Sequence, residues 1–546
     1  MNKALPRWAV CVFFAVFLAL GLLTAADYGP SWDEQTEMDI LRMNLWEYAR
    51  VLGLDESRFE TLAARQGPLS IETLRPISQS IEQDHGTAAF YPFGWVVLDL
   101  SLTGAQQSAL WHMACWAVFT LGGFALYATL RQMGLSRGWA LLGPVCLLLT
   151  PPFFAHGHFN NKDIALFSLA LCGLWQSLAL ARRPGFARGA CFALCGALAA
   201  NTKVAGLALW GLCALYVLIR LLMERRMTPR VWGVAGMTVL SFAALYALLT
   251  PALWADPAAF FGYLLSNAVA FQRWNGYVLF RGSVFNTTSQ PLPWYYLPYM
   301  MLATTPLWIL MLCAAGTALA LWTGVRRLRA RDASGLVPLL TVLLWLLPLA
   351  FAVLTRTRVY NGWRHFYFLY AGFIVLAAWG LETLLRWARG LNGAAIAGIL
   401  ALCMAADGVG VLQNHPYQYA YYNFLAPADA EETMELDYWD VSTVNALRLL
   451  LGSERNEALP LTVSGTDALS HLGLEQALSA LTAEEKALLT VTNRQEDAPY
   501  LFMNTTYGRI YGVTVPRDYH VLLTIESYGH TICTVYERME KGTRRD

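Results

Sequence analysis

The chain has 546 residues, of which 56% are hydrophobic and only 14% are charged, and its formal net charge is +1. Together with a positive mean hydropathy, this composition lies far from that of soluble globular proteins and indicates a polytopic α-helical membrane protein. The sequence contains no basic run with interleaved aromatic residues, so we expect no nucleic-acid partner.

About eleven apolar stretches are long enough to cross a hydrocarbon layer of about 30 Å. They lie near 8–26, 108–130, 138–155, 163–181, 188–201, 204–222, 231–250, 295–322, 335–354, 366–385 and 393–413. The first stretch follows Lys3 and Arg7 and resembles a signal peptide. Its length favours an uncleaved membrane anchor.

The arginines of the connecting loops predict how the spans are oriented. If the amino terminus is cytoplasmic, every arginine cluster falls in a cytoplasmic loop, as the positive-inside rule requires. These clusters are Arg131 and Arg137, then Arg182, Arg183 and Arg188, then Arg220, Arg225, Arg226 and Arg230, then Arg326, Arg327, Arg329 and Arg331, then Arg386 and Arg389. This orientation depends on the short stretch at 188–201. If that stretch did not cross the membrane, every later loop would lie on the opposite side.

In this orientation residues 27–107 form a long external loop of the transmembrane domain, which spans residues 1–413. Ile40, Leu41 and Leu45 recur at helical spacing, and 90–102 is apolar but too short to span the membrane. We expect both segments to be helices that lie in the plane of the interface and flank a site at the membrane surface.

The composition becomes that of an ordinary soluble domain over residues 414–546. His520–Glu537 alternates like two strands joined by a turn at 527–530, Tyr500–Thr505 is typical of another strand, and Leu472–Leu489 is typical of a helix. The sequence therefore predicts a small α+β domain on the external face.

Two adjacent carboxylates, Asp33 and Glu34, follow the first span within about ten residues and so lie at the membrane surface. Such a pair suits acid–base chemistry. A structural alternative remains open, because Ser31 to Glu34 also has the pattern of a capping box at a helix start.

Cations gather on the same external side, against the general bias of the loops. They are Lys162, Lys203, Arg356, Arg358, Arg364 and His365, with Arg273 and Arg281. Placing a charged side chain in or near the membrane costs free energy, so such residues usually have a functional or structural role. Snorkelling to lipid headgroups is our interpretation of Arg273 and Arg281, whereas Lys203 and Arg364 are better explained by an anion-binding pocket.

A cationic pocket that faces a carboxylate suggests that phosphate leaves a lipid carrier. Nucleotide sugars are cytoplasmic, so an external glycosyl transfer would draw on a polyprenyl-phosphate sugar donor whose tail lies among the membrane lipids. A carboxylate would remove the proton of the acceptor hydroxyl, and cations would stabilise the charge that grows on the phosphate.

At these residues the chain resembles the GT-C superfamily of integral-membrane glycosyltransferases, in the bacterial branch similar to protein O-mannosyltransferases and to the lipid A aminoarabinose transferase. The resemblance covers most of residues 1–445. Its elements are Trp32 to Glu34, Asn160 to Asp163, Asn201 to Lys203, Pro293 to Pro298 with Thr305 and Pro306, Gly362 to Tyr367, His415 to Asn423, and Leu436 to Trp439.

The resemblance implies an inverting transfer to a hydroxyl of an acceptor lipid, glycan or protein, at the inner membrane of a bacterium. Asp33 is then the base and Glu34 supports the base or the acceptor. The donor phosphate is held by Lys203, Arg364, His365 and Lys162. Sugar or acceptor contacts come from Asp84, His85, Asn161 and Tyr360. For Asp84 and His85, a solvated turn is an equal alternative. The β-trefoil of eukaryotic protein mannosyltransferases does not follow here, which leaves the acceptor open.

Other polar groups favour less specific interpretations. His156, His158 and Asp163 resemble metal ligands without a convincing third partner, so we expect no metal or other cofactor, although a divalent metal stays open. Asp437 and Asp440 could face sugar or could form a packing corner. A transporter or flippase of a lipid-linked or anionic substrate is the alternative function, and it would place charges near mid-membrane and show an internal repeat.

Overall fold

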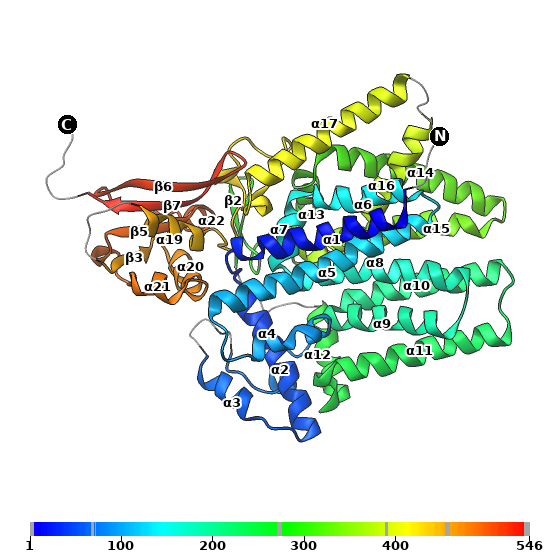
Figure 1. Ribbon diagram of the computed structural model, residues 1–546, viewed down its shortest axis with the longest axis horizontal. Helices are drawn as coiled ribbons and strands as arrows, with labels where there is room; N and C mark the ends of the chain where they lie inside the picture. Colours follow the sequence, from blue (N-terminus) through cyan, green and yellow to red (C-terminus); the bar gives the residue numbers. More distant parts are fainter. Residues whose placement is uncertain are drawn as a thin grey trace.

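The computed structural model describes residues 5–66, 70, 72–269, 276–387, 391–453 and 459–539. Most long helices run side by side, and the carboxyl-terminal sheet lies at the same end of the molecule as the helices of the first loop (Figure 1). We name this the domain end, and the opposite end of the bundle the arginine end. Lys3, Arg273 and Arg389 lie outside the described residues.

Nine helices of the described chain are long and apolar enough to cross a membrane. They are α1 with its 3₁₀ extension (Arg7–Asp27), α5 (Gly104–Gln132), α8 (Asn161–Arg182), α10 (Val204–Met223), α11 (Pro229–Leu249), α14 (Leu307–Arg329), α15 with the preceding turn (Ala333–Thr355), α16 (Leu369–Trp387) and α17 (Leu391–Gln413). The predicted class of polytopic helical membrane protein is confirmed.

The short stretch at 188–201, on which the predicted orientation depends, forms helix α9 (Phe186–Thr202), which has 17 residues. At its carboxyl end, the Asn201 carbonyl accepts a hydrogen bond of 3.0 Å from the Gly86 backbone N–H of the first loop. Its other end lies near Arg182 and Arg183, where Arg226 donates to the Arg182 carbonyl at 2.8 Å. Helix α9 therefore joins the two ends of the bundle, which keeps the predicted alternation of loops.

Two predicted spans are interrupted where prolines remove backbone donors. The stretch 138–155 divides into α6 (Arg137–Leu148) and α7 (Pro151–Phe159), which meet at 75°. The stretch 295–322 divides into α13 (Tyr296–Ala303) and α14, because Pro306 cannot continue α13 and instead precedes α14. Each expected single span was therefore wrong in its continuity.

The first loop is helical where the apolar periodicity predicted it. It contains α2 (Glu34–Leu52), α3 (Ser57–Ala64) and a 3₁₀ turn (Ala88–Phe93) that leads into α4 (Gly94–Leu98). Later segments add α12 (Pro257–Val269) and a hairpin of β1 (Tyr277–Phe280) with β2 (Ser283–Asn286). In Figure 1 helices α2, α3 and α4 lie at the domain end.

The carboxyl-terminal domain is built on a five-stranded mixed sheet in the order β4-β3-β5-β7-β6. The strands are β3 (Leu461–Gly465), β4 (Leu489–Val491), β5 (Tyr500–Asn504), β6 (Tyr519–Ser527) and β7 (His530–Arg538), and the helices are α18 (Ala430–Thr433), α19 (Thr443–Gly452), α20 (Ala468–Ser479), α21 (Ala483–Ala487) and α22 (Thr505–Tyr511). The predicted α+β character, the β6–β7 hairpin and strand β5 are confirmed.

The predicted helix at 472–489 was wrong in its extent. Helix α20 ends at Ser479, and Thr482 starts α21 with a capping box that includes Glu485. The segment then turns into strand β4, which pairs in parallel with β3. The predicted helix is therefore broken at residues 480–482, and only its last residue, Leu489, belongs to the strand.

Helices α14 and α16 cross with their backbones in close contact. A Cβ atom on Gly316 would lie 2.1 Å from the Leu376 carbonyl oxygen, and a Cβ on Gly380 would lie 2.7 Å from the Gly316 Cα. Small residues at such crossings let membrane helices approach closely. This crossing lies directly below the loop that enters α16.

We expect Gly316→Leu to destabilise the protein by about 1–3 kcal/mol or more, because the added side chain must separate two packed helices. Thermal unfolding of the purified protein in detergent measures the effect. Gly236→Leu on α11 is the matched control, since no atom lies within 4 Å of a Cβ at that position. Equal unfolding temperatures for the two variants would contradict the role of this crossing.

Candidate functional site

The predicted site residues meet at the domain end, at corners where one helix stops and the next begins. Asp33 immediately precedes α2, Lys162 opens α8, Lys203 lies between α9 and α10, and Arg364 begins a 3₁₀ turn (Arg364–Phe366) before α16. Helix ends leave backbone groups unpaired and carry polar side chains readily. Residues distant in sequence thus share one polar cluster.

The centre of this cluster is a buried carboxylate, Asp163, which is only 2% exposed. The ammonium of Lys203 contacts its Oδ1. Arg364 Nη1 lies 3.5 Å from its Oδ2, and the Asn160 side-chain amide donates to the same oxygen at 3.0 Å. Sequence reasoning considered Asp163 only as a metal ligand; its position beside Lys162 in a short loop was the available signal.

Asp33 reaches the same cluster from the first loop. Its Oδ2 lies 3.2 Å from Arg364 Nη1, and its side chain is 47% exposed, whereas that of Arg364 is 8% exposed. The accessible carboxylate is therefore held against a buried cation. This is the geometry expected for a carboxylate that meets a substrate from solvent.

Aromatic rings support the guanidinium of Arg364 from two sides. Its Cζ lies 4.5 Å from the centre of the Trp439 ring and 5.3 Å from that of Tyr360. Its Nε is buried and has no hydrogen-bond partner within the described part of the chain. The Arg364 guanidinium is therefore stacked on aromatic rings and only partly hydrogen-bonded.

Glu34 turns away from this cluster. Ser108 Oγ donates to its Oε1 at 2.6 Å, and His112 Nε2 lies 2.7 Å from its Oε2. His112 Nδ1 donates to the Ala25 carbonyl at 2.9 Å. This buried pair fixes the start of α2.

The capping-box alternative for Ser31 to Glu34 is wrong. Helix α2 begins at Glu34 without a side-chain cap, and Ser31 Oγ has no partner among the residues described. The Glu34 carboxylate is bound to α5 instead. The adjacent acids thus have separate surroundings, and only Asp33 faces the cations.

Lys162 forms a second group beside Asp33. Its ammonium lies 2.5 Å from Glu37 Oε1, and the Asn161 amide donates to Glu37 Oε2 at 3.2 Å. His85 Nδ1 lies 3.2 Å from Lys162 Nζ and 2.5 Å from Glu82 Oε2. The structure therefore brings His85 and Asn161 to Lys162.

Asp84 lies slightly apart from this group. Its Oδ2 accepts a hydrogen bond of 3.2 Å from the Asn267 amide on α12. Asp84 thus connects the first loop to α12, and this contact places it beyond the Lys162 group.

Burial lowers the pKa of two predicted phosphate ligands, Lys203 and His365. Burial lowers the pKa of Lys203, although Asp163 opposes this effect. Burial, together with the charges of Arg364 and Lys203, lowers the pKa of His365 well below its ordinary value. His365 is therefore neutral at neutral pH and can accept or donate a hydrogen bond without adding charge.

Asp437 and Asp440 occupy the corner between the bundle and the carboxyl-terminal domain. Asp437 accepts backbone hydrogen bonds from Val441 at 3.0 Å and Ser442 at 3.1 Å. Asp440 Oδ1 accepts from the Thr443 hydroxyl and from the Asn504 amide, each at 2.8 Å. These contacts support the packing-corner alternative.

The histidines of α7 are bound within the protein. His156 Nε2 lies 3.2 Å from the Tyr438 hydroxyl, and His158 Nε2 lies 3.0 Å from Thr24 Oγ1. The His158 ring stacks on Tyr28 with centroids 4.3 Å apart. Among the described residues, no group of three His, Cys, Asp or Glu side chains could hold a metal ion.

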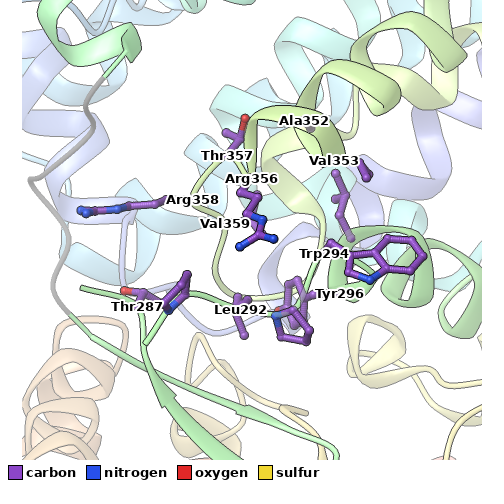
Figure 2. A pocket seen from close by; sticks show the side chains of 13 residues that line it. Thr287, Leu292, Trp294, Tyr296, Ala352, Val353, Arg356, Thr357, Arg358 and Val359 are labelled. Carbon is purple, nitrogen blue, oxygen red and sulfur yellow. The ribbon is translucent and has the colours of Figure 1, made fainter. Parts of the chain in front are cut away.

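A small cavity of about 40 Å³ lies where α15 ends. Figure 2 shows Arg356 pointing toward Leu292 and Tyr296, while Arg358 extends away from them. The volume corresponds to roughly one or two water molecules, so a sugar does not fit. Arg281, which we expect to snorkel, is exposed, and its Cζ lies 5.6 Å from the centre of the Tyr299 ring.

A further buried carboxyl, which sequence reasoning missed, is Glu435. Burial raises its pKa from the ordinary value of 4.5 to about 8, although the Leu279 backbone N–H and the charge of Arg364 oppose the rise. Its Oε2 has no hydrogen-bond partner in the described ranges. Glu435 is therefore mostly a neutral acid at neutral pH.

The fold and this cluster define a polytopic helical membrane protein with a charged site at one end of its bundle. Neither a scan of family models nor a search of curated proteins gives a match. The chain is similar to ArnT from Cupriavidus metallidurans in crystal structures of the apo state and of the complex with undecaprenyl phosphate. The identities are 14% and 13%, the TM-scores are 0.44 and 0.46, and the alignments cover 96% and 97% of this chain and 98% of ArnT.

Two other solved structures show a likeness of the same degree. The Archaeoglobus fulgidus oligosaccharyltransferase, in the apo form, is 11% identical with a TM-score of 0.47, and the alignment covers 98% of this chain and 76% of that one. The arabinofuranosyltransferase AftD from Mycobacteria is 15% identical with a TM-score of 0.43, and the alignment covers 98% of this chain and 40% of that one. These likenesses are distant, so function must be argued from the site.

The raised pKa of Glu435 predicts a pH dependence of stability. The folded state binds the proton more tightly than the unfolded state, so this contribution is complete below about pH 4.5 and is lost as the pH rises through about 8. We expect Glu435→Gln to flatten the fall in unfolding temperature between pH 5 and pH 9. Glu526→Gln, at an exposed position of β6, should keep the wild-type slope, and equal slopes for all three proteins would refute this prediction.

Proposed function

We propose that this protein is a glycosyltransferase that moves a sugar from a polyprenyl-phosphate donor to an acceptor hydroxyl, with inversion at the anomeric carbon. The observation that carries the proposal is the exposed carboxylate of Asp33, held 3.2 Å from buried Arg364 beside Lys203 and Lys162. The resemblance of the sequence motifs to the GT-C superfamily supports it independently.

The residues can divide the reaction between them. Asp33 accepts the proton of the acceptor hydroxyl while the oxygen of that hydroxyl bonds to the anomeric carbon. The bond between that carbon and the phosphate oxygen breaks, and polyprenyl phosphate leaves with one more negative charge. Arg364 and Lys203 stabilise this charge as it forms.

The cluster also explains how an anion could enter a site that is already paired. Arg364 and Lys203 share the buried carboxylate of Asp163, and Lys162 is paired with Glu37. A bound phosphate would add a second anion to these cations and compete with Asp33 for Arg364. Displaced from that ion pair, Asp33 would become a stronger base.

The position of the cluster suits a donor that is a lipid. It lies at the domain end of the bundle, where the α7–α8 and α9–α10 corners meet the first loop, so a phosphate there can be joined to a tail that lies among the membrane lipids. We propose the orientation indicated by the arginine clusters. The site and the domain at 414–546 are then periplasmic, and the amino terminus is cytoplasmic, in the inner membrane of a bacterium.

The transporter or flippase alternative predicts a different arrangement. Secondary transporters bind substrate near the bilayer midplane, at the interface of structural repeats. Here the Asp33 cluster lies at one end of the bundle, and the chain uses a long helical loop to bring the carboxylate there. Catalysis at the membrane surface accounts for both features.

We expect Asp33→Asn to lower the rate of sugar transfer by about 10²–10⁴-fold, the usual contribution of a general base, while donor binding persists. Release of polyprenyl phosphate from labelled polyprenyl-phosphate monosaccharides in nanodiscs measures the rate. Asp99→Asn, an exposed acid of the same loop that only caps Ser101, should be unaffected. Donor binding without release by the wild type, under every acceptor mixture, would instead favour transport.

We expect Lys203→Met to weaken binding of polyprenyl phosphate by at least about tenfold, because a charged hydrogen bond contributes about 1.5–3 kcal/mol. Lys486→Met is the control, since Lys486 lies on α21 in the carboxyl-terminal domain. Titration of the purified protein with the lipid in nanodiscs measures affinity. Equal affinities of the two variants would remove Lys203 from the phosphate site.

A further inference from the structure

A second, larger cavity lies in the seam between the first loop and the carboxyl-terminal domain. Its volume is about 280 Å³. It is lined by α2, α3, the start of α5 and, from the other side, by Gln476 and Ser479 of α20. We name it the seam cavity.

The domain is held firmly against the loop at this seam. The Gln476 side-chain amide donates to the Ser31 carbonyl. The backbone at Gly104 approaches α20 so closely that a Cβ atom there would lie 2.1 Å from the Ser479 carbonyl oxygen. The wall supplied by α20 is therefore a fixed part of the cavity.

The first turn of α2 separates the seam cavity from the cationic cluster. Glu37 projects to the cluster, where it pairs with Lys162. Gln35, Met38 and Arg42 line the cavity, as does Glu34. Asp33 lies at the start of this dividing turn, so a group that extends from the cavity over the turn meets the carboxylate.

The lining combines apolar side chains, such as Met38 and Leu62, with polar ones. Two of its charged side chains are paired within the protein. Asp39, behind the wall, accepts hydrogen bonds from Gln35 at 3.0 Å and from Gln66 at 3.1 Å, and its Oδ1 lies 2.5 Å from Arg42. Glu34 is bound to His112. Neutral amide and hydroxyl groups therefore supply most of the polar lining, beside the charged Glu34, Arg42 and Arg65.

These features identify a class of ligand. Groups that both donate and accept hydrogen bonds suit the hydroxyls of a neutral sugar, and the apolar side chains suit the faces of its ring. The volume is at the lower end of the usual range for ligand sites, about 300–1,000 Å³. It is therefore adequate for a single sugar unit and too small for an extended chain.

We propose that the seam cavity binds a neutral sugar of the acceptor, so that the acceptor is a glycan or glycolipid whose reacting hydroxyl extends over the first turn of α2 to Asp33. This inference rests on the function proposed above. It gives the carboxyl-terminal domain a role in acceptor recognition, through Gln476 and Ser479.

The test is binding of methyl glycosides to the full-length protein in nanodiscs. The probes are methyl α-glucoside, methyl α-mannoside, methyl β-galactoside and methyl N-acetyl-β-glucosaminide, measured by saturation-transfer NMR. We expect at least one probe to bind the wild type. Ser479→Trp should weaken that probe at least tenfold because the new ring fills the cavity. Ala468→Trp, at an exposed position of the same helix that does not line the cavity, should bind it normally.

A second variant keeps the test informative if Ser479→Trp does not fold. Gln35→Leu keeps the size of the side chain but removes its donor and acceptor, and we expect at least fivefold weaker probe binding in a protein that still unfolds cooperatively. Absence of binding by the wild type, or equal binding by wild type, Ser479→Trp and Gln35→Leu, would overturn the proposed sugar site.

Donor turnover separates this inference from the proposed function. Release of polyprenyl phosphate to water, without acceptor, measures donor turnover by the wild type. Probe binding that Ser479→Trp abolishes, together with no release by the wild type from any donor, would refute the glycosyltransferase and leave only a sugar site. Release without probe binding would refute the seam cavity alone.

Discussion

The site depends on one buried carboxylate. Asp163 lies between Lys203 and Arg364, two cations that would be costly to hold in a poorly hydrated environment without a nearby negative charge. Three separate corners of the bundle must meet for this contact to form: α7–α8, α9–α10 and the loop before α16. The same interaction therefore organises the helix ends, and Nη1 of Arg364 contacts both Asp163 and Asp33.

The first loop is positioned by a different constraint. Glu34 is tied to α5 through Ser108 and His112, and Glu37 is tied to α8 through Lys162 and Asn161. These two anchors fix successive sides of the first turn of α2. Asp33, at the start of that turn, keeps its carboxylate accessible while its backbone is held. An exposed carboxylate with a fixed backbone is well suited to the proton transfer that we propose.

The carboxyl-terminal domain continues this arrangement. Trp439 provides a face for Arg364, and Tyr438 contacts His156 of α7. On the other side of α2, Gln476 contacts the Ser31 carbonyl. The domain therefore contributes to both sides of the dividing turn: an aromatic support for the proposed donor site and a wall of the seam cavity. Through these two contacts the small sheet domain helps to position the charged residues at the end of the helical bundle.

Local patterns in the sequence were enough to predict the membrane class, most of the spans and the strands β5 to β7, because hydrophobic length and alternation are local properties of the chain. It also indicated Asp33, Lys203 and Arg364 as members of one site, since their charges are unexpected beside apolar spans. Only the tertiary structure decided that Glu34 faces away from Asp33, that α6 and α7 meet at a sharp angle, and that Asp163 and Glu435 are buried. These features depend on contacts between segments distant in sequence, where burial and partner charges, rather than local pattern, determine what each side chain does.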